Sequence, residues 1–237
     1  MSLEIENLSF ADLGRTILNG MSMTFPLGGR ITGLLGPNGA GKSTLFRCIM
    51  GFERGYRGEI RFAGQSLNAL SPSARSRRGI GYLPQESWLF QDLNVEENLL
   101  LVGELMDKRG AALAEEVQAA IREMGLGAAR GTRGEHLSGG ERRRLEFART
   151  LMMKPKILLL DEPFSGIDPK TVQEITHIVL GLKARGIATV LSDHYAQQIL
   201  DLSDRAYVLA GGALIAAGAP EDVRRDPRVR EIYLGTI

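Results

Sequence analysis

The sequence has one cysteine, few aromatic residues and no long apolar run, and these shortages exclude whole classes of protein. The single cysteine, Cys48, excludes an internal disulfide framework and fits a reducing compartment. No apolar run approaches the roughly 18 residues of a membrane-spanning helix, and runs such as 157–160 and 213–217 have the length of a strand. The N-terminal residues lack the basic and apolar regions of a signal peptide. We therefore expect a soluble chain that acts on a membrane only through a partner.

An excess of charge of one sign is also missing. Lys and Arg number 29 against 28 Asp and Glu, which leaves a net charge of +1, so no bulk charge attracts nucleic acid or an anionic membrane. The arginines at 75–78 and 142–144 have no aromatic residues interleaved with them, and only 6% of the chain is aromatic. We interpret both clusters as solvated helix faces or subunit-docking sites, and we expect no nucleic-acid partner. The arginines at 224–230 alternate with acids and predict a polar C-terminal helix.

Glycine, in contrast, is abundant, with 29 residues in 237, or about 12% against a usual value of about 7%. The glycines lie singly or in pairs between segments that have the periods of strands and helices. The expected strands are 3–10, 21–25, 30–35, 59–62, 79–83, 157–160, 187–191 and 206–209. The expected helices are 42–50, 138–153, 170–184 and 195–202, with a helical pattern from 96 to 124. This order predicts an α/β core that is interrupted by a helical insert.

A phosphate loop is predicted at residues 36–43, where Gly-Pro-Asn-Gly-Ala-Gly-Lys-Ser fits the pattern G-x-x-x-x-G-K-[ST]. Gly39 and Gly41 let the backbone curl, so that successive N–H groups point into one concavity at a helix N-terminus. Lys42 can bridge the β- and γ-phosphates of a nucleotide, and the Ser43 hydroxyl can bind Mg²⁺. A glycine-rich turn before an ordinary helix is the alternative, and the strand and helix that flank the loop make it the weaker one.

A pair of carboxylates, Asp161 and Glu162, follows the apolar strand 157–160. Asp161 leaves the strand at its C-terminal end, where open α/β sheets bind their ligands. In phosphate-loop enzymes such an aspartate holds Mg²⁺, usually through water. Glu162 points to the other face and can act on an attacking water as a general base. Acids after strands are common, so this pair is informative only together with the phosphate loop.

The segment Leu137-Ser138-Gly139-Gly140-Glu141 has two interpretations. Its serine and glutamate form the capping box of a helix start, which alone assigns no function. The pentapeptide also resembles the signature motif of the ABC-transporter ATPases. Residues 83–85 (Leu-Pro-Gln) resemble the Q-loop of that family, 165–168 (Ser-Gly-Ile-Asp) its D-loop and 192–194 (Ser-Asp-His) its switch histidine. With the phosphate loop and the carboxylate pair, these motifs follow the family's order.

The resemblance implies that the chain binds ATP and Mg²⁺, and it gives a role to each matching residue. Mg²⁺ would be held by Ser43, Gln85 and Asp161. Glu162 would polarise the attacking water, and His194 would hydrogen-bond the γ-phosphate, so that the expected catalytic residues are Gln85, Glu162 and His194. The expected nucleotide-binding residues are Gly36, Pro37, Asn38, Gly39, Ala40, Gly41, Lys42, Ser43, Thr44 and Asp161, and, across a dimer interface, Ser138, Gly139, Gly140 and Asp168.

The resemblance also implies an architecture and partners. Residues 1–86 and 154–237 would form a RecA-like phosphate-loop core with an N-terminal antiparallel β subdomain, and about 87–153 an inserted α-helical subdomain, in one ATPase domain. Family members clamp two ATPase units head to tail around ATP. Since each motif occurs once, we expect a homodimer. Its closure on ATP and reopening after hydrolysis would drive separate membrane permease subunits, which would keep this cytoplasmic chain on the inner face of the cell membrane.

Within the family, the chain most resembles the group that contains LptB, the ATPase of lipopolysaccharide export, and the ATPases of branched-chain amino-acid uptake. The matching stretches are 74–86, 138–144, 161–169 and 232–235. The group's adenine-stacking tyrosine is expected near position 12, where this chain has Asp12, so Phe10 becomes the candidate for that contact. Permease docking is expected at Trp88-Leu89-Phe90-Gln91-Asp92, after the Q-loop. We expect a transport ATPase for lipopolysaccharide export, with branched-chain amino-acid uptake as the alternative.

Two functions outside transport compete with this expectation. ABC ATPases that work on DNA or ribosomes usually carry a long coiled coil or two fused ATPase units, and 237 residues leave room for neither. A phosphate-loop GTPase or kinase would not explain residues 137–141, and the guanine-reading pattern Asn-Lys-x-Asp is absent from the sequence. Both alternatives are therefore weaker than a transport ATPase.

Overall fold

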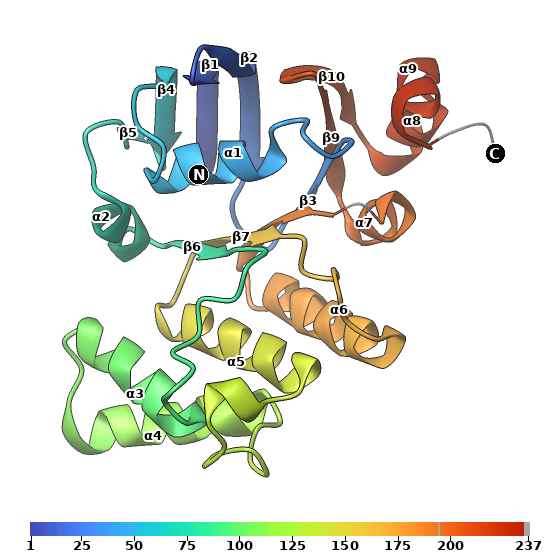
Figure 1. The fold of residues 1–237 in the computed structure, drawn as a ribbon. Helices are drawn as coiled ribbons and strands as arrows, with labels where there is room; N and C mark the ends of the chain where they lie inside the picture. Colours follow the sequence, from blue (N-terminus) through green and yellow to red (C-terminus); the bar gives the residue numbers. More distant parts are fainter. Residues whose placement is uncertain (194, 235–237) are drawn as a thin grey trace.

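Strands and helices alternate along the chain in the order that the sequence predicts (Figure 1). The computed structural model describes residues 1–193 and 195–234. The strands are β1 Ser2–Asp12, β2 Arg15–Pro26, β3 Ile31–Leu35, β4 Arg57–Phe62, β5 Gln65–Ser66, β6 Ile80–Leu83, β7 Ile157–Asp161, β8 Ala188–Ser192, β9 Arg205–Ala210 and β10 Ala213–Gly218. The helices are α1 Lys42–Met50, α2 Pro72–Arg77, α3 Val95–Leu105, α4 Gly110–Glu123, α5 Gly139–Met152, α6 Pro169–Ala184, α7 Ala196–Leu202, α8 Pro220–Arg225 and α9 Pro227–Val229, with short helical turns η1 Gly134–His136 and η2 Arg230–Leu234.

The central sheet determines where the motifs meet. Its strand order is β10-β9-β3-β8-β7-β6, and all neighbours pair in parallel except the edge pair β10–β9. Strands β3, β7 and β8 are buried along their whole length, which explains their apolar runs. Because parallel strands end at the same edge of a sheet, the segments that follow β3, β6, β7 and β8 come together there.

A second, four-stranded antiparallel sheet, with the order β2-β1-β4-β5, covers one side of the molecule. The apolar residues of β1 alternate with polar ones, and Leu3, Ile5 and Leu8 are buried. Helix α1 lies between this sheet and the central sheet (Figure 1). One apolar cluster fills this layer and includes Phe46, and Leu159 of β7.

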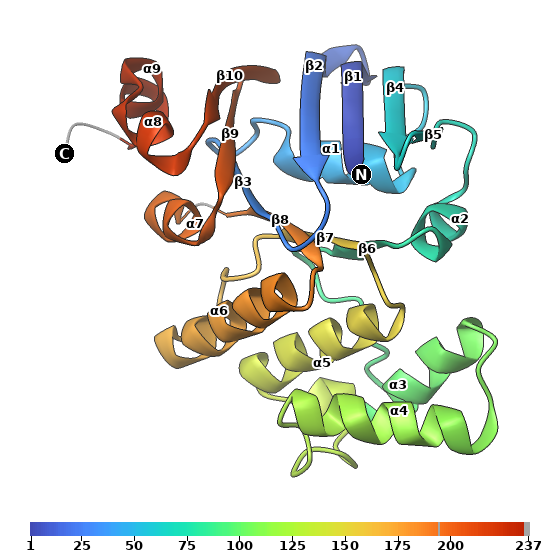
Figure 2. The ribbon, with the colours of Figure 1, turned by 180° about the vertical axis from the view of Figure 1, so that it is seen from behind.

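Helices α5 and α6 cover the opposite face of the central sheet, and α3 and α4 pack against α5 on the side away from the sheet, as the view from behind also shows (Figure 2). Their apolar residues join those of the sheet in a second cluster, which contains Val95 of α3, Val117 of α4, Leu145 of α5 and Leu158 of β7. The helical segment therefore shares a core with the sheet. None of the helices within residues 1–193 and 195–234 combines the length and the apolar character that crossing a bilayer requires.

The interpretation of the arginine clusters as solvated faces is wrong for Arg75 and Arg143, and the expected C-terminal helix is not continuous. Arg75 and Arg143 are only 2% and 7% exposed, so neither belongs to a solvated face. The guanidinium of Arg75 instead donates to the carbonyls of Cys48 and Ile49, both at 2.8 Å, at the C-terminal end of α1. The expected polar C-terminal helix is divided into α8 and α9, because the ring nitrogen of Pro227 cannot donate to a continuing helix.

Candidate functional site

The loop between β3 and α1 is shaped by glycines with positive φ angles. These angles are 149° at Gly36, 79° at Gly39 and 101° at Gly41, a region that favours glycine. A Cβ at Gly36 would lie 2.3 Å from the carbonyl oxygen of Leu209, whereas Gly39 faces open space. No side chain caps the start of α1, so its first N–H groups point toward a concave loop that an anion can enter.

Lys42, the first residue of α1, holds its charge at the base of this loop. Its side chain is 5% exposed, and Nζ donates to the carbonyl oxygens of Gly36 at 2.7 Å and Pro37 at 3.2 Å. Burial lowers the pKa of Lys42, and the nearby carboxylates of Glu162 and Asp161 oppose this shift. The Lys42 ammonium group is thus hydrogen-bonded to loop carbonyls, and a phosphate can bind the same group.

A cavity of about 680 Å³ opens over the loop. Its volume lies within the range of small-molecule sites. Two residues of β2, Arg15 and Ile17, line one part of it, and Ser165 lines another. The remaining lining residues are all predicted site residues: Asn38, Gly39, Ala40, Gly41, Lys42, Ser43, Thr44, Gln85 and Glu162. The structure thus brings the phosphate loop, the Q-loop glutamine and the second carboxylate to one cavity.

Asp161 is held from two sides at the end of β7. The carboxylate is 1% exposed, and it accepts hydrogen bonds from Ser192 Oγ at 2.7 Å and from the Tyr82 hydroxyl at 3.3 Å. Burial, with the adjacent negative charge of Asp161, raises the pKa of Tyr82, so the phenol stays protonated and donates. Each carboxylate oxygen therefore has one donor that fixes its direction.

Glu162 turns toward the cavity because its backbone leaves the strand conformation. Its φ angle is 47°, unusual for a residue other than glycine, and its N–H donates to the carbonyl oxygen of Ser192 at 2.7 Å. Gln85 Nε2 donates to Glu162 Oε2 at 2.9 Å. Such strained conformations cluster at functional sites, and here the conformation places a carboxylate against a polar amide that lines the same cavity.

Ser138 of the motif at 137–141 and Asp168 of the motif at 165–168 each cap a helix. Ser138 caps α5 in a capping box with Glu141, and its hydroxyl donates to Glu141 Oε2 at 2.6 Å. Asp168 caps α6 and accepts a 2.6 Å hydrogen bond from the hydroxyl of Thr171. A Cβ at Gly140 would lie 2.9 Å from that same hydroxyl, so the two helix starts are adjacent. Neither Ser138 nor Asp168 lines the cavity, although Ser165 of the second motif does.

Two other predictions concern Phe10 and His194. Phe10 is 9% exposed, packs in the core beneath the antiparallel sheet and does not line the cavity, where Arg15 and Ile17 lie instead. The side chains of β1 alternate between its two faces, and Phe10 lies on the inward face. Its closeness to position 12 in the sequence does not reveal this. His194 lies outside the described residues. Tyr82 is not among the predicted site residues, because it lies in the middle of the expected strand 79–83 and belongs to none of the functional motifs.

The oxygen atoms around the cavity fit Mg²⁺ bound together with a phosphate. Within the described part of the chain, no three His, Cys, Asp or Glu side chains gather as a metal cluster. Mg²⁺ does not need such a cluster, because it usually takes one or two carboxylates, waters and substrate phosphates. The hydroxyl of Ser43, the amide oxygen of Gln85 and the nearby carboxylate of Asp161 supply oxygens of this kind.

Comparison with known proteins identifies the family. The profile of the family described as ABC transporter matches residues 18–165. The chain belongs to the ABC transporter ATPase family. Its relatives include the lipopolysaccharide export system ATP-binding protein LptB of Haemophilus influenzae, 42% identical over 98% of this chain and 97% of the relative. LptB of Escherichia coli K12 is 40% identical over 99% of this chain and 97% of the relative.

Solved structures confirm the fold of an ABC ATPase. The ADP conformation of the ATP-binding cassette MJ1267 of an ABC transporter matches with a TM-score of 0.86 and 30% identity over 100% of both chains. cbiO1 from Clostridium perfringens, part of an ABC transporter complex, matches with a TM-score of 0.84 and 28% identity over 97% of this chain and 92% of the other. A second profile, described as branched-chain amino acid ATP-binding cassette transporter, matches residues 213–236. The chain is an ATP-binding and ATP-hydrolysing subunit of an ABC transporter.

Proposed function

We propose that this ATPase powers the export of lipopolysaccharide or a related lipid from a membrane, as the ATP-dependent half of a complex with permease subunits. ATPase subunits of ABC transporters work with membrane permeases. The similarity to lipopolysaccharide export ATPases over nearly the whole chain is the observation that carries the proposed substrate class. We expect the chain to lie on the cytoplasmic face of the membrane, bound through those permeases.

The cavity residues suggest how ATP is bound and hydrolysed. The N–H groups of residues 38–44 surround the phosphates, and Lys42 exchanges its loop carbonyls for a phosphate oxygen. Ser43, Gln85 and Asp161 would hold Mg²⁺, which would supply positive charge to the phosphate oxygens. Glu162 accepts a proton from the attacking water, and Gln85, which donates to Glu162 Oε2, orients that carboxylate.

A second copy of the chain completes the site in this proposal. Ser138, Gly139 and Gly140 lie at the exposed N-terminus of α5 and away from their own cavity, so they are available to a nucleotide on the facing subunit. Asp168, whose cap lies beside Gly140, would occupy the same interface. His194 is proposed to bind the γ-phosphate. ATP thus joins the two subunits head to tail.

Residues 88–92 are the proposed docking site for a permease. Trp88 and Phe90 are 49% and 44% exposed, although large apolar side chains are usually buried. Arg149 of α5 supports both, since its guanidinium donates to the Trp88 carbonyl at 2.5 Å and lies 4.8 Å from the centroid of the Phe90 ring. The segment from about 87 to 153 is proposed as a helical subdomain that moves with the permease.

The test of this function uses Glu162→Gln, which retains the shape of the side chain and removes the proton acceptor. We expect the variant to bind ATP, to lose nearly all hydrolysis and to elute as a dimer on gel filtration with ATP and Mg²⁺. Glu135→Gln, an exposed carboxylate outside the site, is the matched control and should hydrolyse ATP like the wild type. A Glu162→Gln protein that binds ATP and stays monomeric would contradict the dimer mechanism.

Branched-chain amino-acid uptake is the second candidate, because the C-terminal residues 213–236 match the profile of those transporters. The permease that copurifies with the chain in detergent distinguishes the two. A pair of lipid-extracting permease subunits would support export, and an amino-acid permease would support uptake. Recovery of ribosomes or DNA would contradict both.

A further inference from the structure

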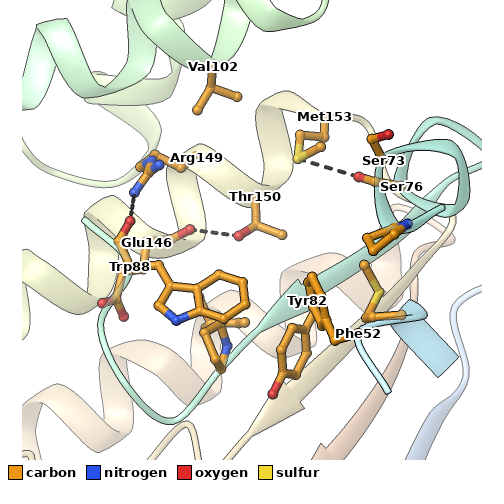
Figure 3. A pocket seen from close by; sticks show the side chains of 14 residues that line it. Phe52, Ser73, Ser76, Tyr82, Trp88, Val102, Glu146, Arg149, Thr150 and Met153 are labelled. Atoms are coloured by element: carbon orange, nitrogen blue, oxygen red, sulfur yellow. Dashed lines mark hydrogen bonds between the residues drawn. The ribbon is translucent and has the colours of Figure 1, made fainter. Parts of the chain in front are cut away.

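An aromatic groove lies beside the nucleotide cavity, and Tyr82 forms part of its wall. The groove has a volume of about 270 Å³, and residues of α2, β6 and α5 line it together with Phe52 and Trp88. The ring centroid of Tyr82 lies 6.1 Å from that of Phe52 and 5.9 Å from that of Trp88. Figure 3 shows these three side chains gathered at one end of the groove. The rings of Tyr82 and the half-exposed Trp88 thus pack edge to face.

The hydroxyl of the same side chain reaches the nucleotide site. It donates to Asp161 Oδ2 at 3.3 Å, while the other oxygen of that carboxylate accepts from Ser192. The register of the sheet explains this reach, because Tyr82 on β6 pairs with Leu159 on β7, and Leu159 and Asp161 point to the same face of β7. A single rigid side chain therefore spans from the groove to a buried carboxylate.

We propose that Tyr82 is a positioning residue that couples the aromatic groove to the Asp161 carboxylate. The inference rests on the proposed function, in which Asp161 faces Mg²⁺ and the groove adjoins the permease-docking residues. Binding of Mg²⁺ by the Asp161 carboxylate would change its hydrogen bond with the Tyr82 hydroxyl. A shift of the phenol ring would then change the contacts of Tyr82 with Phe52 and Trp88. The reverse also holds, because such a coupling is reciprocal. A partner at the groove then adjusts the direction of Asp161.

Trp88 makes this coupling measurable, because it is the only tryptophan of the chain. The full chain is saturated with ATP in EDTA, Mg²⁺ is then added in steps, and the emission of Trp88 is recorded. We expect the wild type to show a saturating change in emission. Tyr82→Phe, which keeps the ring and removes the hydroxyl, should lose at least about half of the amplitude and require at least about threefold more Mg²⁺ at the midpoint. ATP affinity without Mg²⁺ should stay within about twofold of the wild-type value.

Tyr56→Phe is the matched control, since it also removes a phenolic hydroxyl, one that bonds to Asn68 and Arg75 instead of Asp161. Its Mg²⁺ titration should match that of the wild type. A Tyr82→Phe protein with the wild-type amplitude and midpoint would overturn the coupling and leave the proposed function intact. No emission change in a wild type that binds ATP would overturn the coupling too. Failure of the wild type to bind ATP would overturn the proposed function itself.

Discussion

At the scale of single residues, Arg75 shows how a buried charge can hold a functional helix in place. Its side chain is 2% exposed and donates to the carbonyls of Cys48, Ile49 and Leu70. Two of these carbonyls lie at the C-terminal end of α1, where the helix dipole favours a cation. We expect Arg75→Met to lower the free energy of unfolding by about 2–4 kcal/mol, measured by urea denaturation.

Arg77 provides the matched control for that prediction. It lies on the same short helix, α2, and is exposed, so Arg77→Met should change the free energy of unfolding by less than about 0.5 kcal/mol. Equal losses in the two variants would mean that the burial of Arg75 has no energetic importance.

Residues also mark the limit of what the sequence could predict. The phosphate loop and the pair Asp161–Glu162 were predicted because local spacing and a strand end define them, and most of the predicted cavity residues do meet. Arg75 and Tyr82 escaped prediction because their roles depend on partners remote in the sequence, Cys48 and Asp161 respectively. Composition could not distinguish a buried arginine from a solvated one, since only the tertiary fold supplies the carbonyls that it binds.

At the scale of elements, helix α5 connects three parts of the site. Its N-terminus carries Ser138, and its residue Arg143 donates to the carbonyl oxygens of Pro84 at 3.3 Å and Glu162 at 3.4 Å. Arg143 also pairs with Glu146 at 2.8 Å, and each side chain is 8% exposed. Movement of this helix therefore changes the backbone on either side of the cavity.

Arg143→Met should lower the free energy of unfolding by about 3–5 kcal/mol, because it leaves Glu146 buried without its cation. The double variant Arg143→Met/Glu146→Leu removes both charges and should recover most of this stability. Its ATP hydrolysis should nevertheless stay at least about tenfold below that of the wild type, since the contacts with Pro84 and Glu162 are still missing. Recovery of both stability and hydrolysis would show that Arg143 only stabilises the fold.

The junction between β3, α6 and β9 gives a prediction about pH. Burial opposes the shift, but the Ile31 amide and the Lys183 ammonium hold the pKa of Asp204 below its ordinary value. This stabilisation is fully present above the unfolded pKa of about 3.9 and is lost as the pH falls through the lower folded-state value. Asp204→Asn should cost about 0.5–1 kcal/mol at pH 7, and this cost should shrink in unfolding experiments below pH 4. A cost that is constant with pH would contradict the assignment.

At the scale of the whole molecule, the shared core predicts cooperative unfolding. Val95 and Val117 of the helical segment lie in the same apolar cluster as Leu158 of the central sheet, so the helical segment has no core separate from that of the sheet. The emission of Trp88 reports on the junction between them, and circular dichroism reports on all helices. Both signals should give one urea transition with the same midpoint. Two separate midpoints would mean that the helical segment unfolds independently.

The thiol of Cys48 is a probe of how often helix α1 opens in the native protein. Cys48 is fully buried in α1, and burial raises its pKa to about 12, so the folded protein offers almost no reactive thiolate. Alkylation can then proceed only when the helix that follows the phosphate loop opens. Its rate in native buffer, followed by mass spectrometry, measures how often that helix detaches, and ATP should slow it in proportion to the occupancy of the loop.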